Sequence, residues 1–204
     1  MIAIVDYGVG NLFSLKSSFA AIGKDVSVTG DPAALRCAER IVLPGVGAFG
    51  DAAEKLRRSG LDAAVKAEAA AGKPLLGICL GMQLLFEKSF EYGEHAGLGL
   101  IPGAVKPIAD VIPAEYKIPH IGWNALQFRA PSPLLRHVRE GDCVYFVYSF
   151  AAFDCDESVI ATAEYGPELT AAVQRDNVFG CQFHPEKSGT VGLNILRAFC
   201  EVTP

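Results

Sequence analysis

An apolar run that ends in a glycine-flanked cysteine is the feature that most constrains how this chain can fold. The run Pro74-Leu75-Leu76 leads directly into Gly77-Ile78-Cys79-Leu80-Gly81-Met82-Gln83. Because glycines tolerate a sharp turn, the segment predicts a buried strand, a tight turn at Cys79 and a helix that begins directly after it. Such a turn places one side chain at the carboxyl end of a sheet, where the amides and dipole of the next helix favour the thiolate form of a cysteine. The segment therefore predicts an α/β fold that carries a cysteine nucleophile.

The first half of the chain alternates short apolar runs with helical patterns. Apolar residues at helical spacing cover 12–22 and also 49–71, where Ser59-Gly60 marks a break. A helix is also expected over 80–87. Strands that alternate with helices in this rhythm predict parallel βαβ units, and hence an open, mostly parallel, doubly wound sheet with helices on both faces. The predicted strands are 2–5, 25–28, 40–43 and 73–78.

The second half is rich in glycine and proline over 88–141 and then contains short β-branched or aromatic runs. These runs are separated by turn residues, so they predict a mainly antiparallel extension of the sheet, with Asp176-Asn177 as a hairpin turn. A closing helix is expected from Gly189. Since no repeat or linker is visible, residues 1–204 are expected to form a single domain. The predicted strands lie near 104–106 and 120–123, and at 143–150, 158–165, 170–175 and 178–183.

Charge and hydropathy argue against several classes of protein. The net charge is −5 and no basic cluster stands out, so nucleic-acid binding is not expected. Apolar runs are far shorter than the roughly 20 residues of a membrane-spanning helix, so membrane association is not expected either. The chain starts without a charged leader and its six cysteines form no CxxC pair, which predicts a cytoplasmic protein with reduced thiols. His95, His120 and His137 lack ligand spacing, so no metal is expected.

A histidine and a glutamate two residues apart follow near the C-terminus, in His184-Pro185-Glu186. Pro185 biases His184 towards extended backbone at the end of a strand, and Glu186 can then reach the second ring nitrogen. A carboxylate in that position fixes the tautomer of a histidine and stabilises its protonated form. Together with Cys79, these residues predict a Cys-His-Glu triad and acyl transfer through a thioester.

Acyl transfer also requires hydrogen-bond donors for the oxyanion that forms. The amide of Leu80, directly after the cysteine, is one candidate. The loop Pro44-Gly45-Val46-Gly47 is the other, because it follows a neighbouring strand and its glycines let backbone N–H groups approach a substrate. Each motif alone is weak, since glycine turns and His-Pro-Glu sequences are common. Their combination in one chain favours a functional site.

Cys79 in its glycine turn, taken with His184-Pro185-Glu186, resembles the triad (class I) glutamine amidotransferases. Longer segments are similar to one branch of that family, the glutaminase subunits of imidazole glycerol phosphate synthase. These segments are Asp6-Tyr7-Gly8-Val9-Gly10-Asn11, Leu43-Pro44-Gly45-Val46-Gly47-Ala48-Phe49, Gly97-Leu98-Gly99-Leu100-Ile101-Pro102-Gly103, Pro119-His120-Ile121-Gly122-Trp123-Asn124 and Phe183-His184-Pro185-Glu186-Lys187-Ser188-Gly189.

The resemblance implies a reaction without a cofactor. Cys79 attacks the side-chain amide of glutamine, His184 moves the proton and Glu186 orients the imidazole. Ammonia then passes to the other subunit of a heterodimer, a (β/α)8-barrel cyclase, which makes imidazole glycerol phosphate and the purine precursor AICAR in histidine biosynthesis. The residues implied to hold glutamine or its oxyanion are Gly45, Val46, Gly47, Leu80 and Gln83.

The resemblance further implies control by the partner, because the oxyanion loop offers its donor only in the active state. Asn11, Trp123, Tyr148 and Lys187 are expected at the partner interface. Tyr148 departs from the family pattern, in which a histidine usually precedes the serine found here as Ser149. A tyrosine keeps a hydrogen-bonding ring there but cannot take up and release a proton at neutral pH as a histidine does.

Other functions share these motifs. The glutaminase of another triad amidotransferase, of the anthranilate, GMP or pyridoxal-phosphate synthase type, would differ in its acceptor partner, and Asn11, Trp123 and the segment 187–189 argue against it. A cysteine peptidase or chaperone-like relative is not expected to place His-Pro-Glu here. A non-catalytic regulatory relative would keep the fold without a reactive thiol. A glutamine-analogue electrophile that labels Cys79 faster than the other five thiols would exclude that last alternative.

Overall fold

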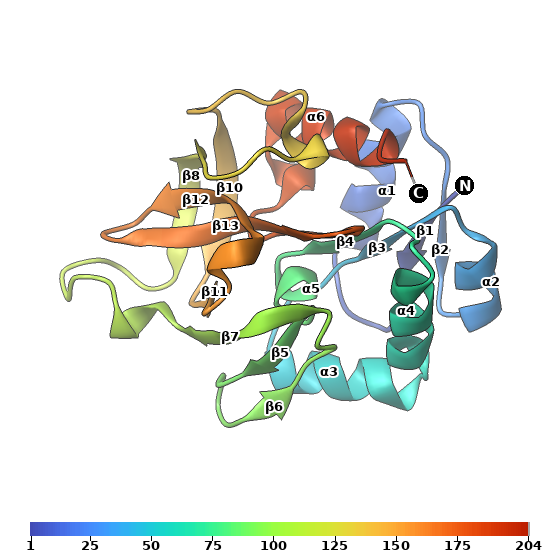
Figure 1. Ribbon diagram of the computed structural model, residues 1–204, viewed down its shortest axis with the longest axis horizontal. Coiled ribbons are helices and arrows are strands. Elements are labelled where there is room, and N and C mark those ends of the chain that lie inside the picture. Colours follow the sequence, from blue (N-terminus) through green and yellow to red (C-terminus); the bar gives the residue numbers. More distant parts are fainter. Residues whose placement is uncertain (204) are drawn as a thin grey trace.

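The computed structural model describes residues 1–203 and shows a mixed α/β fold built on one large sheet (Figure 1). Eight strands form this sheet. The four strands of the first half of the chain, β1 to β4, run parallel to one another, as predicted, and β14 from the second half also pairs in parallel with β4. In spatial order the strands are β2 (Val26–Thr29), β1 (Ile2–Val5), β3 (Arg40–Leu43), β4 (Leu75–Ile78), β14 (Val178–Cys181), β13 (Glu168–Arg175), β12 (Val159–Glu164) and β9 (Gln127–Phe128).

Helices cover both faces of the large sheet (Figure 1). Alternate residues of β1 belong to two different cores: Ile4 packs in the same core as Phe19 and Phe199, whereas Val5 shares the other with Phe49 and Val65. This burial on both faces is typical of a central parallel strand. The helices are α1 (Leu12–Ala21), α2 (Pro32–Cys37), α3 (Phe49–Arg58), α4 (Leu61–Ala70), α5 (Leu80–Gln83) and α6 (Gly189–Cys200), with 3-10 turns at Ile108–Asp110, Pro133–Leu135, Asp156–Ser158 and Pro185–Lys187.

The second half of the chain is divided among three sheets. Strands β13, β12 and β9 extend the large sheet in antiparallel fashion, and the Asp176-Asn177 turn joins β13 to β14, as predicted. The remaining strands form a two-stranded sheet and a four-stranded sheet of their own. The two-stranded sheet contains β10 (Cys143–Tyr148) and β8 (His120–Ala125), and the four-stranded sheet contains β11 (Phe150–Phe153), β7 (Ile101–Pro107), β5 (Phe86–Ser89) and β6 (His95–Ala96).

The predicted single strand over 143–150 is wrong, because the chain changes sheets at Ser149. Strand β10 pairs with β8, and β11 pairs with β7. Between them, the backbone oxygen of Ser149 accepts a hydrogen bond of 3.0 Å from the backbone N–H of Ile108. The residues therefore have the composition of one strand, but their pairing partners lie in different parts of the chain.

The helix after Cys79 is also shorter than predicted. It ends at Gln83, and Phe86 already begins β5, so the expectation of a helix over 80–87 is wrong beyond its first turn. The cause is tertiary: the N–H of Leu98 donates to the carbonyl of Leu84 at 2.8 Å. Backbone groups that would extend the helix find partners in a later segment instead.

Helix α2 is not among the predicted elements, although its start is marked in the sequence. Asp31 accepts a hydrogen bond of 2.8 Å from the N–H of Ala33, and Pro32 occupies the first helical position. The predicted break at Ser59-Gly60 is confirmed, because Gly60 takes a left-handed conformation between α3 and α4. Within residues 1–203 no helix combines the length and the apolar character that a bilayer crossing requires.

Candidate active site

The turn after β4 holds Cys79 in a strained backbone conformation. Its φ of 54° and ψ of −112° are rare for a residue with a side chain, and α5 begins at the next residue. The flanking glycines make this turn possible: a Cβ on Gly77 would lie 2.6 Å from the oxygen of Gly81, and a Cβ on Gly81 would lie 1.9 Å from the oxygen of Leu43. Because α5 has a single turn, its dipole at Cys79 is smaller than that of the longer helix predicted from the sequence.

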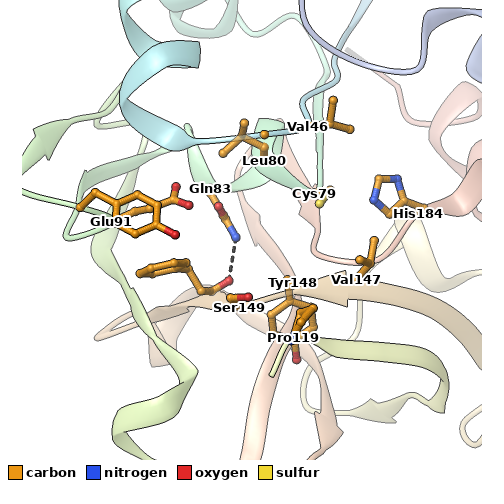
Figure 2. Close-up of a pocket in the computed structure, with 13 residues that line it drawn as sticks. Val46, Cys79, Leu80, Gln83, Glu91, Pro119, Val147, Tyr148, Ser149 and His184 are labelled. Atoms are coloured by element: carbon orange, nitrogen blue, oxygen red, sulfur yellow. Dashed lines mark hydrogen bonds between the residues drawn. The ribbon is translucent and has the colours of Figure 1, made fainter. Parts of the chain in front are cut away.

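His184 and Glu186 form a buried pair beside this turn. His184 follows β14, and its N–H donates to the carbonyl of Tyr145 at 2.9 Å. The turn at Pro185–Lys187 brings Glu186 back, so that Nδ1 of His184 lies 2.8 Å from Oε1 of Glu186. The two side chains are only 3% and 2% exposed. Because Nδ1 is engaged with the carboxylate, Nε2 is the nitrogen left for Cys79, and Figure 2 shows the imidazole next to the sulfur.

The surroundings of His184 favour its protonated form. Burial acts to lower the pKa of His184, but hydrogen bonds to Cys79 and Glu186 and the charges of both groups outweigh it and raise that pKa to about 9. His184 therefore holds a proton on each ring nitrogen at neutral pH. The sulfur, imidazole and carboxylate lie in the order that the sequence predicts for a Cys-His-Glu triad.

The loop Pro44-Gly45-Val46-Gly47 packs directly on the turn that holds Cys79. A Cβ on Gly45 would lie 2.7 Å from the backbone nitrogen of Gly81, so only glycine permits this contact. The hydroxyl of Tyr7 donates to the carbonyl of Pro44 at 2.7 Å and fixes the start of the loop. Beyond this anchor the loop is open, since Val46 is 44% exposed and Gly47 has a φ of 91°.

These groups line one cavity of about 320 Å³ (Figure 2). The cavity thus brings together most of the predicted triad and substrate residues, whereas Glu186 and Gly45 do not line it. Those in its wall are Cys79, His184, Val46, Gly47, Leu80 and Gln83. Other residues of the wall were not among the predicted site residues, although Pro119 and Ser149 belong to segments that carry the family resemblance. They are Glu91, Tyr92, Pro119, Val147, Ser149 and Phe150.

Glu91 shows why such residues escape a reading of the sequence. It lies between β5 and β6, and its carboxylate accepts a hydrogen bond of 2.6 Å from the N–H of Phe49 at the start of α3. The contact joins segments 42 positions apart. No local pattern around Glu91 indicates that it reaches the cavity. Among residues 1–203, no group of three or more His, Cys, Asp or Glu side chains is arranged to hold a metal ion.

Gln83 takes part in a buried chain of side-chain amides. Its Nε2 donates to the carbonyl of Phe150 at 2.7 Å and to Oε1 of Gln182 at 3.0 Å. Gln182 in turn donates from Nε2 to the sulfur of Cys79 at 3.7 Å. The sequence signal for Gln182 was its position two residues before His184, next to the motif but outside it.

The residues expected at a partner interface fall into two environments. Trp123 is 56% exposed, and its ring meets Tyr145 edge-on with centroids 6.2 Å apart. The ammonium group of Lys187 lies 5.7 Å from the centroid of the same tyrosine ring. Asn11 is exposed and accepts a hydrogen bond of 3.2 Å from the N–H of Ser14 as the cap of α1.

Tyr148 differs from these surface residues because its side chain is buried in the cavity wall. Its hydroxyl lies 3.0 Å from Nδ1 of His120. Burial raises the pKa of Tyr148, and it lowers the pKa of His120 to about 4, so both rings are neutral at pH 7. His120 stacks between Phe146 and Tyr165, with centroids 5.1 and 4.0 Å away.

Comparison with known proteins places this geometry in a family. Residues 3–202 match the family described as glutamine amidotransferase class-I. The chain is 50% identical to the imidazole glycerol phosphate synthase subunit HisH of Wolinella succinogenes, over 99% of this chain and 100% of that protein. It is 48% identical to the HisH subunit of Moorella thermoacetica, over 98% of this chain and 94% of that protein.

Solved structures share the fold. A crystal structure described as glutamine amidotransferase superposes with a TM-score of 0.77 at 20% identity, and covers 98% of each chain. The PurLQS structure from Thermotoga maritima gives a TM-score of 0.76 at 21% identity, over 98% of this chain and 96% of that chain. Fold, motifs and whole-length similarity agree, and the chain belongs to the class I glutamine amidotransferase family.

Proposed function

We propose that this chain is the glutaminase subunit of an imidazole glycerol phosphate synthase, and that residues 1–204 act as one glutamine amidotransferase domain. The observation that carries the proposal is that His184, paired with the buried Glu186 carboxylate, lines the same cavity as Cys79, with its imidazole next to the sulfur (Figure 2). Similarity of 46–50% identity to HisH subunits over nearly the whole chain supports this branch of the family.

The chemistry follows from the protonation of His184. The Cys79 thiolate attacks the carboxamide carbon of glutamine, and the imidazolium of His184 gives a proton to the departing nitrogen, so ammonia leaves and a glutamyl thioester remains. His184 then takes a proton from water, which attacks the thioester and releases glutamate and the thiol. Glu186 holds Nδ1 throughout and stabilises the imidazolium.

Backbone amides of two segments stabilise the oxyanion in this proposal. The N–H of Leu80 lies directly after the nucleophile and is fixed by the turn. The second donor comes from Val46 or Gly47, whose loop is anchored at Tyr7 and open beyond it. Loss of one such donor typically costs about 2.7–4 kcal/mol of barrier, so the position of this loop controls the rate.

Ammonia is used by a second subunit. The HisH relatives are named as subunits of a synthase, which supports a partner for this chain as well. We propose that the partner is a (β/α)8-barrel cyclase and that it contacts the surface formed by Trp123, Tyr145 and Lys187, and also the exposed Asn11. All six cysteines are free thiols, which supports a cytoplasmic location.

The proposal is tested by glutamate release from glutamine, measured for the chain alone and with the barrel cyclase and its nucleotide ligand. We expect a low rate for the chain alone and a strong rise in the full mixture. Cys79→Ser should fold, bind the partner and show no turnover. An unchanged rate in the mixture, with Cys79 still reactive towards a glutamine analogue, would contradict the choice of partner and lead to the acceptor subunits of other amidotransferases.

A further inference from the structure

Gln182 is a fully buried polar residue that touches the reactive sulfur. Its side chain is 0% exposed, and its backbone N–H continues the ladder with β13 by donating to Ala171 at 2.8 Å. The Nε2 atom of Gln182 donates to the sulfur of Cys79 at 3.7 Å, while its Oε1 accepts from Gln83 at 3.0 Å. Both ends of this amide are therefore engaged with residues of the cavity.

The orientation of the Gln182 amide is fixed by a backbone carbonyl at the far end of the chain of hydrogen bonds. The Phe150 oxygen can only accept, so Gln83 must present its nitrogen to it. The same nitrogen faces Gln182, which must then offer its oxygen there. A flipped Gln182 would set two NH₂ groups against each other. The nitrogen of Gln182 is thus directed at the sulfur by contacts that do not involve Cys79.

An N–H group held in this way interacts more strongly with a negative sulfur than with a neutral thiol. Hydrogen bonds to ionised groups are roughly twice as strong as those between neutral groups. The contact also restricts the rotamer of Cys79. The same contacts orient Gln83. Its amide nitrogen donates to Gln182, so its amide oxygen takes no part in this chain of hydrogen bonds, and the Gln83 side chain lines the cavity.

We propose that Gln182 is a positioning residue of this site, which holds the Cys79 thiolate for attack and fixes the Gln83 amide against the cavity. The inference rests on the proposed function, in which Cys79 is the nucleophile of a glutaminase. In this inference, the buried amide of Gln182 aligns the nucleophile Cys79 with Gln83, the residue expected to contact glutamine. The proton transfers themselves remain with His184.

The test compares Gln182→Met with a matched control. Methionine is unbranched and of similar length, but it donates no hydrogen bond. Gln127→Met makes the same chemical change in β9, at a half-buried position of the antiparallel edge. For each variant the rate of iodoacetamide alkylation at pH 7.5 is measured for Cys79 and for the exposed Cys143 by peptide mass spectrometry.

We expect Gln182→Met to melt within a few degrees of the unmodified chain and to lower the Cys79-to-Cys143 alkylation ratio about tenfold or more. With partner and nucleotide present, kcat should fall by a similar factor, and the KM for glutamine should rise because Gln83 loses one restraint. Gln127→Met should change none of these values. An unchanged alkylation ratio in folded Gln182→Met would overturn the proposal.

Two further measurements keep the outcome decisive. Gln182→Leu removes the same hydrogen bonds and replaces Gln182→Met if the latter does not fold. In the chain with Gln182 intact, the side-chain NH₂ resonances of Gln182 should shift in Cys79→Ala while those of Gln127 stay in place; unmoved Gln182 signals would also overturn the proposal. Absence of glutamine turnover in the unmodified complex would instead contradict the proposed function, and the alkylation ratio would still report on Gln182.

Discussion

Nδ1 of His184 lies 2.8 Å from Oε1 of Glu186, and both side chains are almost completely buried. The second oxygen of that carboxylate has no hydrogen-bond partner within residues 1–203. A buried carboxylate with a single partner is costly unless that partner carries a positive charge. The pair is therefore stable as an imidazolium and a carboxylate, which is the state in which His184 can give a proton to departing ammonia.

Removal of the base should impair turnover more than removal of its partner. His184→Ala should lower kcat by about 10²–10⁴-fold, the usual contribution of a positioned acid or base. Glu186→Gln should lower it less, because the ring remains in reach of the sulfur. Glutamate release in the presence of the partner measures both, and Tm values show that each variant is folded. Equal losses would mean that Glu186 does more than orient the imidazole.

The protonation of His184 should couple stability to pH. Its folded pKa of about 9 lies above the unfolded value of 6.5, so the stabilisation is fully present below pH 6.5 and is lost as the pH rises through 9. The shift corresponds to about 3 kcal/mol. Urea unfolding at pH 6, 7.5 and 9 should show this loss in the unmodified chain.

Cys79→Ser serves as the control for that pH dependence. The mutation replaces the ionisable thiol, whose charge helps to raise the pKa of His184, with a hydroxyl that stays neutral, while burial continues to lower that pKa. We expect the imidazole to titrate at a lower pH by ¹⁵N NMR, and the stability difference between the two chains to shrink from pH 6.5 to 9. A titration midpoint that stays near 9 would show that Glu186 alone holds the proton.

Two glycines near Cys79 should respond very differently to substitution by alanine. In Gly81→Ala the new Cβ would meet the backbone oxygen of Leu43 at 1.9 Å, and backbone cannot move aside cheaply. We expect a loss of stability of several kcal/mol or failure to fold. Gly47→Ala meets no atom within 4 Å and should cost only about 1–2 kcal/mol for its positive φ. Thermal unfolding checks the order, which similar Tm values would contradict.

Trp123→Ala should weaken association with the partner without affecting the thiol. An exposed tryptophan at the centre of an interface typically contributes about 2–4 kcal/mol to binding. Calorimetry with the cyclase measures the affinity, and labelling of Cys79 by a glutamine analogue should stay at the unmodified rate. Lys187→Ala should reduce stimulation by the partner more than basal turnover. Tyr92→Ala, at an exposed residue that lines the cavity and is not among the expected interface residues, is the matched control for partner affinity.

The amino-acid sequence was sufficient for the parts of this protein that depend on local constraints. The parallel strands β1 to β4 follow from apolar runs, and the turn at Cys79 follows from glycines whose backbone tolerates close contact. The order of Cys79, His184 and Glu186 along the chain predicted a triad, and the fold brings them together because β4 and β14 are neighbours. That adjacency joins residues 105 positions apart, and only the sheet establishes it.

Tertiary structure alone decided the features that depend on distant partners. The helix after Cys79 stops at Gln83 because Leu84 bonds to Leu98. The run 143–150 divides because each part pairs with a different strand. Gln182 reaches the sulfur of Cys79, and Glu91 reaches the cavity, through contacts with residues far away in the chain. Periodicity and turn residues report on a chain's neighbours within a few positions, whereas hydrogen bonds between sheets and loops are selected by the packing of the whole molecule.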